Sequence, residues 1–559
     1  MQGLMQPWPL VVTNIIDYAA RFHGDQEVVG RCPEGYTITT NYREVRQRAQ
    51  LCALALKRLG VRPGDRVGTL AWNTTRHLEA WYGISGSGAV CHTLNPRLFE
   101  KELEYIINHG QDTIIMADIS FAKLLENLAP KLRSVREFIF LTDERQARPV
   151  YPASRRNMPK RSTLKNPLCY EELLEEEVSR LDGFKWDPLD EDQACGLCYT
   201  SGTTGNPKGV LYSHRANFLH AMVICLPDCL DLKSNSSVLA VVPMFHANAW
   251  GLTYAAPLVG AKLVLPGPFL DGTSVERLLV EQRVTHTAGV PTVWLALMEH
   301  LQRSRGARLA HLQIMVVGGA ACPRSIIEYY RDEHSVDVRQ LWGMTEMTPA
   351  GTMGALKGTL AHLDQEAVTR LKLKQGRGHI FVEMRIVDDE GRELPWDGKA
   401  FGNLQVKGPH VISRYFNSDA QGADPEGWFD TGDVATIDQH GYMQITDRSK
   451  DVIKSGGEWI SSIEIENVAM GHPKVSEAAV IGIPDPKWSE RPLLIVVPKQ
   501  GQSPTREEIL GHLEGRIARW WMPDDVAFVK EIPHTATGKI SKLTLRRMFQ
   551  DYKPAKAKL

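Results

Sequence analysis

The segment Tyr199-Thr-Ser-Gly-Thr-Thr-Gly-Asn-Pro-Lys-Gly209 directly follows an apolar run and gathers small hydroxyl and glycine residues beside one lysine. In such a loop, backbone N–H groups and hydroxyls can converge on an anion, and the ammonium group of Lys208 adds positive charge. The segment is not a Walker A loop, because it lacks a Gly-Lys-Ser/Thr at the required spacing. It predicts a phosphate-binding loop after a strand, and its spacing alone leaves a flexible Ser/Thr/Gly turn as an equal alternative.

Around this loop, short apolar runs alternate with amphipathic helical patterns. This alternation is typical of βαβ units and mainly parallel sheets. We therefore expect an α/β fold: a large N-terminal domain with mainly parallel sheets flanked by helices, plus a small mobile α+β C-terminal domain. The expected strands are the run ending at Tyr199 and residues 237–242, 261–265, 314–317 and 338–341, and the expected helices include 275–283 and 323–333.

The pattern of apolar and charged residues changes after about residue 447, where strand-like runs at 477–483 and 493–497 lie between charged loops. Thr505 and Glu508 have the spacing of a capping box, which predicts a helix running to about Trp520. We place the N-terminal domain at residues 1–449 and the C-terminal domain at 450–559. The Pro- and Arg-rich stretch 147–166 is expected to be a surface loop.

Composition excludes several classes of protein. Among 559 residues, Lys plus Arg (65) nearly balances Asp plus Glu (66), which gives no electrostatic footprint for nucleic acid. The nine scattered cysteines suit a reducing compartment rather than a disulfide framework. The uncharged stretch 238–261 contains Pro and Gly, so we expect a buried strand, loop and helix rather than a membrane span.

Six further segments accompany the glycine-rich loop in a fixed order along the chain. Together with that loop they closely resemble the motifs of the adenylate-forming enzymes, which include acyl-CoA synthetases, peptide-synthetase adenylation domains and luciferases. The segments are Pro243-Met-Phe-His-Ala-Asn-Ala-Trp-Gly251, Gly318-Gly-Ala-Ala321, Gln340-Leu-Trp-Gly-Met-Thr-Glu346, Trp428-Phe-Asp-Thr-Gly-Asp433, Asp447-Arg-Ser-Lys-Asp-Val-Ile-Lys-Ser-Gly-Gly457 and Pro533-His-Thr-Ala-Thr-Gly-Lys539.

The resemblance implies ATP, Mg²⁺ and CoA as ligands and assigns a role to each motif. It also places the hinge of the mobile C-terminal domain at Lys450, for which a solvated linker charge is the alternative. Formation of an acyl-adenylate brings a carboxylate against the ATP α-phosphate, so cations and oriented donors should carry the catalysis. The implied catalytic residues are Lys539, Glu346, Thr203 and His246, with Glu346 and Thr203 at the metal; the implied nucleotide and CoA contacts are Thr200, Ser201, Gly202, Thr203, Thr204, Gly205, Lys208, Gly319, Ala320, Trp342, Gly343, Met344, Thr345, Asp433, Arg448, Lys450, Lys454, Gly456 and Gly457, with Trp250 beside the acyl group.

Two of these positions carry alternatives. His246 could be a general base, but the resemblance favours a place in an aromatic gate that moves when ATP or CoA binds. Trp342 stands where Tyr is commoner in the family, so a contact of the phenol hydroxyl is lost although stacking on adenine is retained.

The predicted function is an ATP-dependent carboxylate–CoA ligase that forms acyl-AMP and then acyl-CoA. The uncharged stretch 238–261 favours an apolar acid, and the segment around Trp250 resembles the medium-chain fatty acid and methylmercaptopropionate CoA ligase branch. Methylmercaptopropionate or another short acid, and a non-catalytic binding protein, remain alternatives. Amino acids are disfavoured because no acidic residue lies between Asp231 and Asp271 to hold an ammonium group.

Partners and location follow from the same features. The expected partners are a small carboxylic acid, ATP and CoA, without nucleic acid or a membrane span, and a homodimer is left open. No secretory signal is predicted, since the apolar N-terminus lacks a basic segment. We expect a cytoplasmic protein. The final Ala557-Lys-Leu559 resembles a peroxisomal address, which is the alternative in a eukaryotic source.

Overall fold

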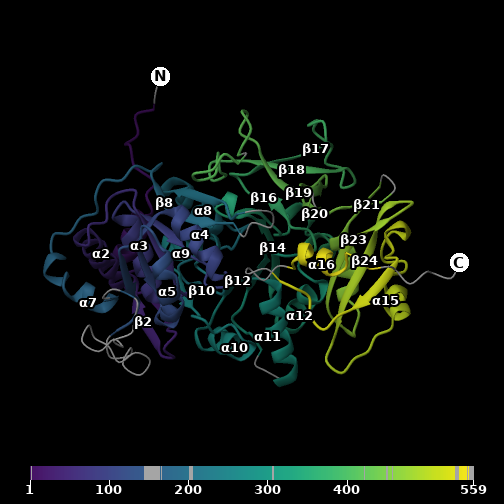
Figure 1. The fold of residues 1–559 in the computed structure, drawn as a ribbon, viewed down its shortest axis with the longest axis horizontal. Coiled ribbons are helices and arrows are strands. Elements are labelled where there is room, and N and C mark those ends of the chain that lie inside the picture. The colour runs from purple at the N-terminus through teal and green to yellow at the C-terminus, as the bar shows by residue number, and fades with distance from the viewer. Residues whose placement is uncertain are drawn as a thin grey trace.

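Two stacked α/β sheets and two smaller β-rich units make up the chain (Figure 1). The structure is a computed structural model. It describes residues 1, 3–143, 164, 167–200, 206–304, 308–420, 422–448, 451–455, 458–534, 540–550 and 552. The predicted surface loop at 147–166 lies almost entirely outside the described residues.

The first sheet is parallel at its centre and antiparallel at both edges. All five strand runs expected from the sequence are strands, four of them in this sheet and the run ending at Tyr199 in the second. In spatial order the described strands of the first sheet are β16 (Arg377–Gly378), β15 (Ala350–Met353), β14 (Asp337–Gly343), β13 (Ile314–Gly318), β12 (His286–Gly289), β10 (Ser237–Ala240), β11 (Lys262–Leu265), β1 (Glu27–Arg31) and β2 (Thr37–Asn41).

The second sheet is parallel except where its last two strands pair. That antiparallel pair flanks the glycine-rich loop. In spatial order the described strands are β7 (Leu168–Cys169), β6 (Glu137–Phe140), β5 (Asp112–Ala117), β3 (Arg66–Leu70), β4 (Val90–Thr93), β8 (Ala194–Tyr199) and β9 (Gly209–Ser213).

Helices fill the space between these sheets and cover their outer faces. One buried cluster combines residues of both sheets with the middle helices α1 (Val12–Phe22), α2 (Tyr42–Arg58), α3 (Thr75–Gly86), α8 (His214–Cys225) and α9 (Leu252–Val259). The first sheet is covered outside by α10 (Gly272–Glu281), α11 (Pro291–Ser304) and α12 (Arg324–His334), and the second by α4 (Glu100–Gly110) and α5 (Ala122–Leu128).

This layering explains the continuous apolar runs that predict the central strands. Along β10 and just beyond it, Val238 and Ala240 pack on the middle helices, whereas Leu239 and Val241 pack on the outer ones. A strand buried on both faces needs apolar residues at every position rather than at alternate ones. The uncharged stretch 238–261 is accordingly a strand, a short 3₁₀ turn and the buried helix α9, as expected.

A four-stranded antiparallel sheet follows the two large ones and was not foreseen in the sequence. It contains β17 (Glu383–Val387), β18 (Phe401–Lys407), β19 (Phe429–Ile437) and β20 (Met443–Arg448), and lies at the upper right in Figure 1. One of its faces is buried and the other is largely polar, so its strands alternate where the parallel strands do not.

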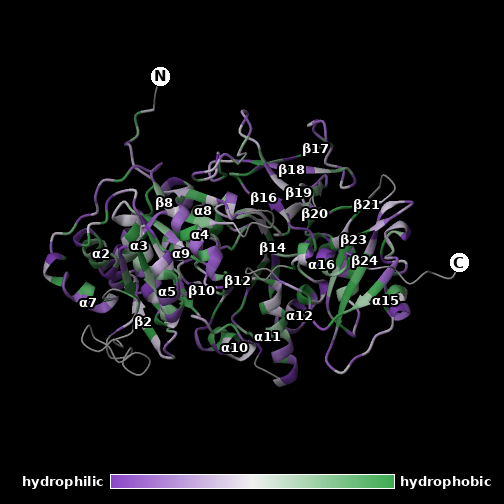
Figure 2. Ribbon diagram, in the orientation of Figure 1, coloured by the Kyte–Doolittle hydropathy of each residue, from purple (hydrophilic) through white to green (hydrophobic). Residues whose placement is uncertain are grey.

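The C-terminal unit is a small α+β structure, coloured yellow-green to yellow in Figure 1. Its long strands β23 and β24 stand out as apolar in Figure 2. Its described sheet contains β22 (Glu458–Ile460), β21 (Ile453–Ser455), β24 (Ser489–Pro498), β23 (Val475–Asp485) and β25 (Asp525–Phe528), and its helices are α14 (Ser462–Met470), α15 (Arg506–Leu513) and α16 (Lys542–Met548).

The α/β fold predicted from the sequence is confirmed, with one correction in the C-terminal unit. Thr505 and Glu508 do form a capping box. However, the helix they begin ends at Leu513 rather than near Trp520, because Gly515 takes a left-handed conformation (φ +74°) just after it. The predicted boundary at 449/450 lies outside the described residues and stays a prediction.

Candidate active site

The glycine-rich loop joins two paired strands, and its neck is fixed by two hydrogen bonds. The Thr200 N–H donates to the carbonyl of Lys208 over 2.9 Å, and the Lys208 N–H donates to Thr200 Oγ1 over 3.3 Å. The intervening predicted ligands Ser201, Gly202, Thr203, Thr204 and Gly205 lie outside the described residues. The loop therefore emerges at the carboxyl end of β8, where ligands of α/β sheets usually bind.

Tyr415 links this loop to the predicted metal ligand. The Lys208 ammonium group lies 4.6 Å from the centre of the Tyr415 ring, and the Tyr415 hydroxyl donates to Glu346 Oε1 over 2.8 Å. Burial, and then the charge of Glu346, raises the pKa of Tyr415 well above its usual range, so the hydroxyl remains a donor. Two motifs far apart in the sequence are thus brought together by a residue that the sequence analysis missed.

A second tyrosine fixes the backbone before Glu346. The hydroxyl of Tyr212, on the strand that follows the glycine-rich loop, donates to the carbonyl of Thr345 over 2.7 Å. Glu346 itself is buried, with 7% of its surface exposed. A hydrogen-bonded carboxylate beside a phosphate-binding loop is a suitable oxygen ligand for Mg²⁺. The described residues contain no cluster of three His, Cys, Asp or Glu side chains arranged for a metal. Phosphate oxygens and water would therefore complete the coordination of an ion bound here.

Three histidines support the segment that follows Glu346: His220 and His410 are buried and His379 is half-buried. His220 accepts from the Ala350 N–H over 3.1 Å, while His379 donates to the Ala350 carbonyl over 2.9 Å and His410 to the Met347 carbonyl over 2.7 Å. Burial lowers the pKa of His379 and of His410 to about 4, so both rings are neutral near neutral pH. Their hydrogen bonds fix the backbone of Met347 and Ala350, directly after Glu346.

Trp342 makes a hydrogen bond that the sequence analysis did not predict. Its indole Nε1–H donates to Asp433 Oδ2 over 2.9 Å, and both side chains are buried. Trp342 ends β14 with Gly343, and Asp433 lies on β19, so two different sheets meet at this contact. The ring expected to stack on adenine therefore also orients the carboxylate expected to bind ribose.

The turn at Gly318 and Gly319 lies against the predicted acyl-pocket residue Trp250. Gly319 has φ +80°, a conformation that favours glycine, and a methyl group on Gly318 would come within 2.8 Å of the Trp250 ring. Of the neighbouring predicted residues, Ala320 is exposed, whereas Met344 and Thr345 are half-buried. The predicted adenine turn and the predicted acyl pocket thus share a wall.

The backbone leading to Trp250 is strained. Ala247, Asn248, Ala249 and Trp250 have φ values of 42°, 58°, 50° and 52°, in the left-handed region that L-residues avoid at about 1–2 kcal/mol each. The Asn248 amide is held by the Asn217 side chain over 2.9 Å. The half-buried His246 lies just before this turn. Its place fits the predicted gate, and a role as general base remains untested.

The remaining predicted residues belong to the hinge and the C-terminal unit. Arg448 is paired with Asp433 across β19 and β20, and Lys454 lies on β21, but their side chains are not among those described. Lys450, Gly456, Gly457 and Lys539 lie outside the described residues.

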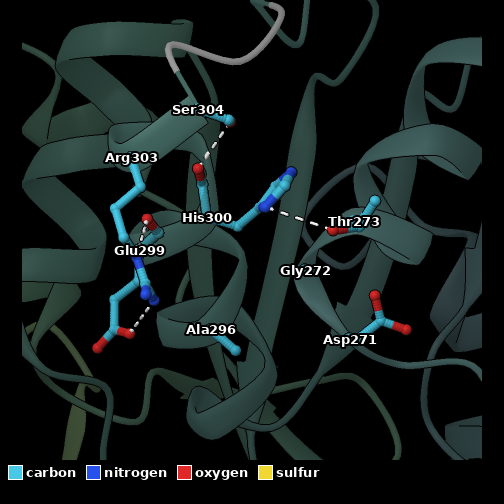
Figure 3. Close-up of a pocket in the computed structure, with 8 residues that line it drawn as sticks. All are labelled: Asp271, Gly272, Thr273, Ala296, Glu299, His300, Arg303 and Ser304. Carbon is cyan, nitrogen blue, oxygen red and sulfur yellow. Dashed lines mark hydrogen bonds and ion pairs between the residues drawn. The ribbon is translucent and has the colours of Figure 1, made fainter.

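A separate cleft of about 550 Å³ lies between the start of α10 and the last turns of α11 (Figure 3). His300 faces Thr273 across it, and the Arg303 and Glu299 side chains pair on its rim. Its lining includes none of the predicted site residues, so this cleft is not the candidate active site.

Comparison with known proteins shows the family to which the chain belongs. The family model described as AMP-binding enzyme matches residues 16–416, and that described as AMP-binding enzyme C-terminal domain matches residues 464–539. The chain therefore belongs to the AMP-binding enzyme family. The crystal structure of the anthranilate CoA ligase AuaEII with anthranoyl-AMP has the same fold, with a TM-score of 0.84 at 24% identity over 98% of this chain and 99% of that one.

Relatives from bacteria narrow the class. The chain is 45% identical to a 3-methylmercaptopropionyl-CoA ligase of Ruegeria lacuscaerulensis, over 99% of each chain. It is 43% identical to a medium-chain-fatty-acid–CoA ligase of Ectopseudomonas oleovorans, over 99% of this chain and 98% of that one. Within the family, the protein is an AMP-forming acyl-CoA synthetase that uses ATP, Mg²⁺ and CoA. No described helix is long and apolar enough to cross a bilayer.

Two substitutions of Trp342 separate its hydrogen bond to Asp433 from its expected stacking on adenine. Trp342→Phe keeps an aromatic face but removes the N–H that donates to Asp433, so we expect the KM for ATP to rise about tenfold, as for a lost hydrogen bond to a charged group. Trp342→Ala should raise it further, since base–aromatic stacking contributes about 1–3 kcal/mol. Steady-state assays with either substrate varied measure this. Equal changes in the KM values for ATP and for the acid would contradict both roles.

Proposed function

We propose that the protein activates a medium-chain fatty acid as acyl-AMP and transfers the acyl group to CoA. The observation that carries this proposal is the buried, uncharged wall formed by β10, the strained turn and α9. The polar side chains of this wall are bonded within the protein, as Asn248 is to Asn217 and Thr253 to the Asn248 carbonyl. Such a wall suits an acid whose tail is neutral and apolar.

Methylmercaptopropionate is the second candidate, because its thioether tail is also short, linear and neutral. Two relatives divide between these acids, with 45% identity to the methylmercaptopropionyl-CoA ligase and 43% to the medium-chain enzyme. The two identities are too similar to favour either the fatty or the thioether acid.

The proposed chemistry has two steps at one site. A carboxylate oxygen of the acid attacks the ATP α-phosphorus, and pyrophosphate leaves with its electron pair. The thiolate sulfur of CoA then attacks the acyl carbonyl carbon, and AMP leaves. Lys208 and the glycine-rich loop would hold the β- and γ-phosphates, Glu346 and Thr203 the metal, and Asp433 with Arg448 the ribose. Mg²⁺, when bound, neutralises charge on the phosphates.

Lys539 is assigned the bridge between the carboxylate and the α-phosphate. As the acid attacks, negative charge moves onto the α-phosphate oxygens, and an ammonium group placed there stabilises the transition state more than the ground state. Lys454, on β21, and the two glycines Gly456 and Gly457 are assigned the pantetheine arm of CoA.

A panel of acids tests the proposal through pyrophosphate release. Because each buried CH₂ contributes about 0.8 kcal/mol, kcat/KM should rise about fourfold per carbon until the pocket is full and then fall. We expect the maximum among straight acids of medium chain length, with methylmercaptopropionate included for comparison. A maximum on amino acids or dicarboxylates would contradict the proposal, and absence of pyrophosphate with every acid would favour a non-catalytic binding protein.

We also propose that the protein works in the cytoplasm as a homodimer. All nine cysteines are free thiols, which supports a reducing compartment. An extended N-terminal arm exposes Leu4, Met5 and Trp8, and apolar groups of this kind usually find a partner surface. Light scattering on the full chain, compared with a chain lacking the first nine residues, measures the oligomeric state.

A further inference from the structure

Asn73 lies in the short loop between β3 and α3 and is buried, with 3% of its surface exposed. Its amide nitrogen donates to the carbonyls of Ala240 and Val242 over 2.8 and 2.7 Å, and its amide oxygen accepts from the Met244 N–H over 2.6 Å. One side chain thus bonds the backbone of every second residue from 240 to 244, in a segment about 170 residues away along the chain.

These three backbone groups lie at the end of β10 and just beyond it. β10 ends at Ala240, and one further bond, from the Val242 N–H to the Ala288 carbonyl over 3.2 Å, ties the chain to the first sheet before it enters the turn that carries His246 and Trp250. A buried backbone group without a partner costs about 1–3 kcal/mol of folding free energy. The hydrogen bonds from Asn73 therefore stabilise the backbone where the strand ends. Because Asn73 lies just after β3, its bonds to the segment after β10 also join the carboxyl ends of the two sheets.

The loop that carries Asn73 is itself held on both sides. The Trp72 N–H donates to Asp118 Oδ2 over 2.6 Å, and the Gly267 N–H donates to the Asn73 carbonyl over 3.0 Å. The Trp72 ring meets the Phe245 ring edge-on, with centroids 6.0 Å apart. The side chain of Asn73 therefore projects from a fixed base, which is what a positioning group requires.

We propose that Asn73 is a positioning residue that fixes the chain between Ala240 and Trp250 and so sets selectivity for the acyl tail. This inference rests on the proposed function, in which that segment lines the acyl pocket. Asn73 does not itself touch the substrate. It acts by holding the backbone from which the pocket side chains project, and a displacement of about 1 Å at such a site can cost about a hundredfold in rate.

The test compares Asn73→Asp with a matched substitution elsewhere. Asn73→Asp keeps an oxygen for the Met244 N–H but replaces two donors with a charge that faces two carbonyls. Asn108→Asp is the control, because Asn108 also bridges a loop, donating to the Lys131 carbonyl over 3.1 Å and accepting from the Arg133 N–H over 2.9 Å, on the outer face of the second sheet. Asn73→Ser, smaller and neutral, serves if Asn73→Asp does not fold.

We expect the Asn73 variants to lower kcat/KM for the preferred acid about a hundredfold while the KM for ATP changes less than about threefold. The ratio of kcat/KM between the preferred acid and one two carbons shorter should fall toward one, and Asn108→Asp should change neither value. Equal losses toward acid and ATP, or an unchanged chain-length ratio, would overturn the proposal.

Hydrogen exchange in the absence of substrate separates this inference from the proposed function. Peptides covering residues 239–250 should exchange faster in the Asn73 variants, whereas those covering Ala350 should not change. Faster exchange in a protein that activates no fatty acid would place the failure in the proposed substrate. Unchanged exchange at 239–250 would show that Asn73 does not hold the segment.

Discussion

Lys539→Ala is expected to lower pyrophosphate release from ATP and acid by about 100- to 1000-fold, as for the loss of one donor to a developing charge. The same variant should still convert supplied acyl-AMP and CoA to thioester at close to the normal rate. Lys539 is assigned to the first step alone, because thioester formation needs no cation between carboxylate and α-phosphate. The two half-reactions therefore respond differently to one substitution.

Lys539 itself lies outside the described residues. The described residues on either side of it are paired, because His534 and Ile540 form an isolated bridge and the Ser541 N–H donates to the Pro533 carbonyl over 2.7 Å. Lys530→Ala is the control, since Lys530 is an exposed lysine of the same unit. Equal loss of both half-reactions in Lys539→Ala would place the lysine outside the proposed role.

The strands around the site were predictable because their signal is local. A strand buried on both faces must be apolar throughout, so β10 and β13 could be recognised from a few residues each. The glycine-rich loop likewise carries its chemistry in consecutive residues. The antiparallel sheet β17–β20 was missed because some of its strands lack a clear alternation: in β17 one exposed and two half-buried residues precede two buried ones.

The contacts that assemble the site could not be predicted. Tyr415 is 69 positions from Glu346, and Trp342 is 91 positions from Asp433. Nothing in the residues beside Tyr415 indicates a partner, because the contact exists only once β9, β14 and the loop before β19 have packed together. For Trp342, the sequence shows which group is lost relative to Tyr but not where the indole N–H points. Long-range hydrogen bonds of this kind follow from the fold rather than from spacing.

The second large effect is expected at the hinge. Lys450→Pro should leave pyrophosphate release in the first turnover largely intact and lower thioester formation about a hundredfold, because a fixed φ near −65° prevents the backbone from rotating. We expect the C-terminal unit to turn between the two steps, because one small domain cannot place both Lys539 and the strand of Lys454 at the same acyl group.

Contacts on the two sides of the predicted hinge show what such a turn would have to exchange. The Ser461 hydroxyl donates to the Thr446 carbonyl over 2.7 Å, the Ser462 N–H donates to Asp447 Oδ2 over 3.2 Å, and the Lys542 ammonium group lies 3.8 Å from Asp447 Oδ1. All three join the end of β20 to the C-terminal helices across residues 449 and 450, which lie outside the described residues. A few such polar contacts are a small barrier that a bound ligand can offset.

Lys450→Ala is the control that separates charge from conformation. It removes the same ammonium group as Lys450→Pro but leaves φ free, so it should retain both half-reactions if Lys450 serves as a pivot. If it instead loses thioester formation as the proline variant does, the side chain rather than the backbone rotation is responsible. If Lys450→Pro and Lys539→Ala both lose pyrophosphate release, the two steps do not use two orientations of the C-terminal unit, and the rotating-domain mechanism is wrong for this protein. Rapid-quench measurement of acyl-AMP and acyl-CoA in one turnover distinguishes these outcomes, because it counts the product of each step separately.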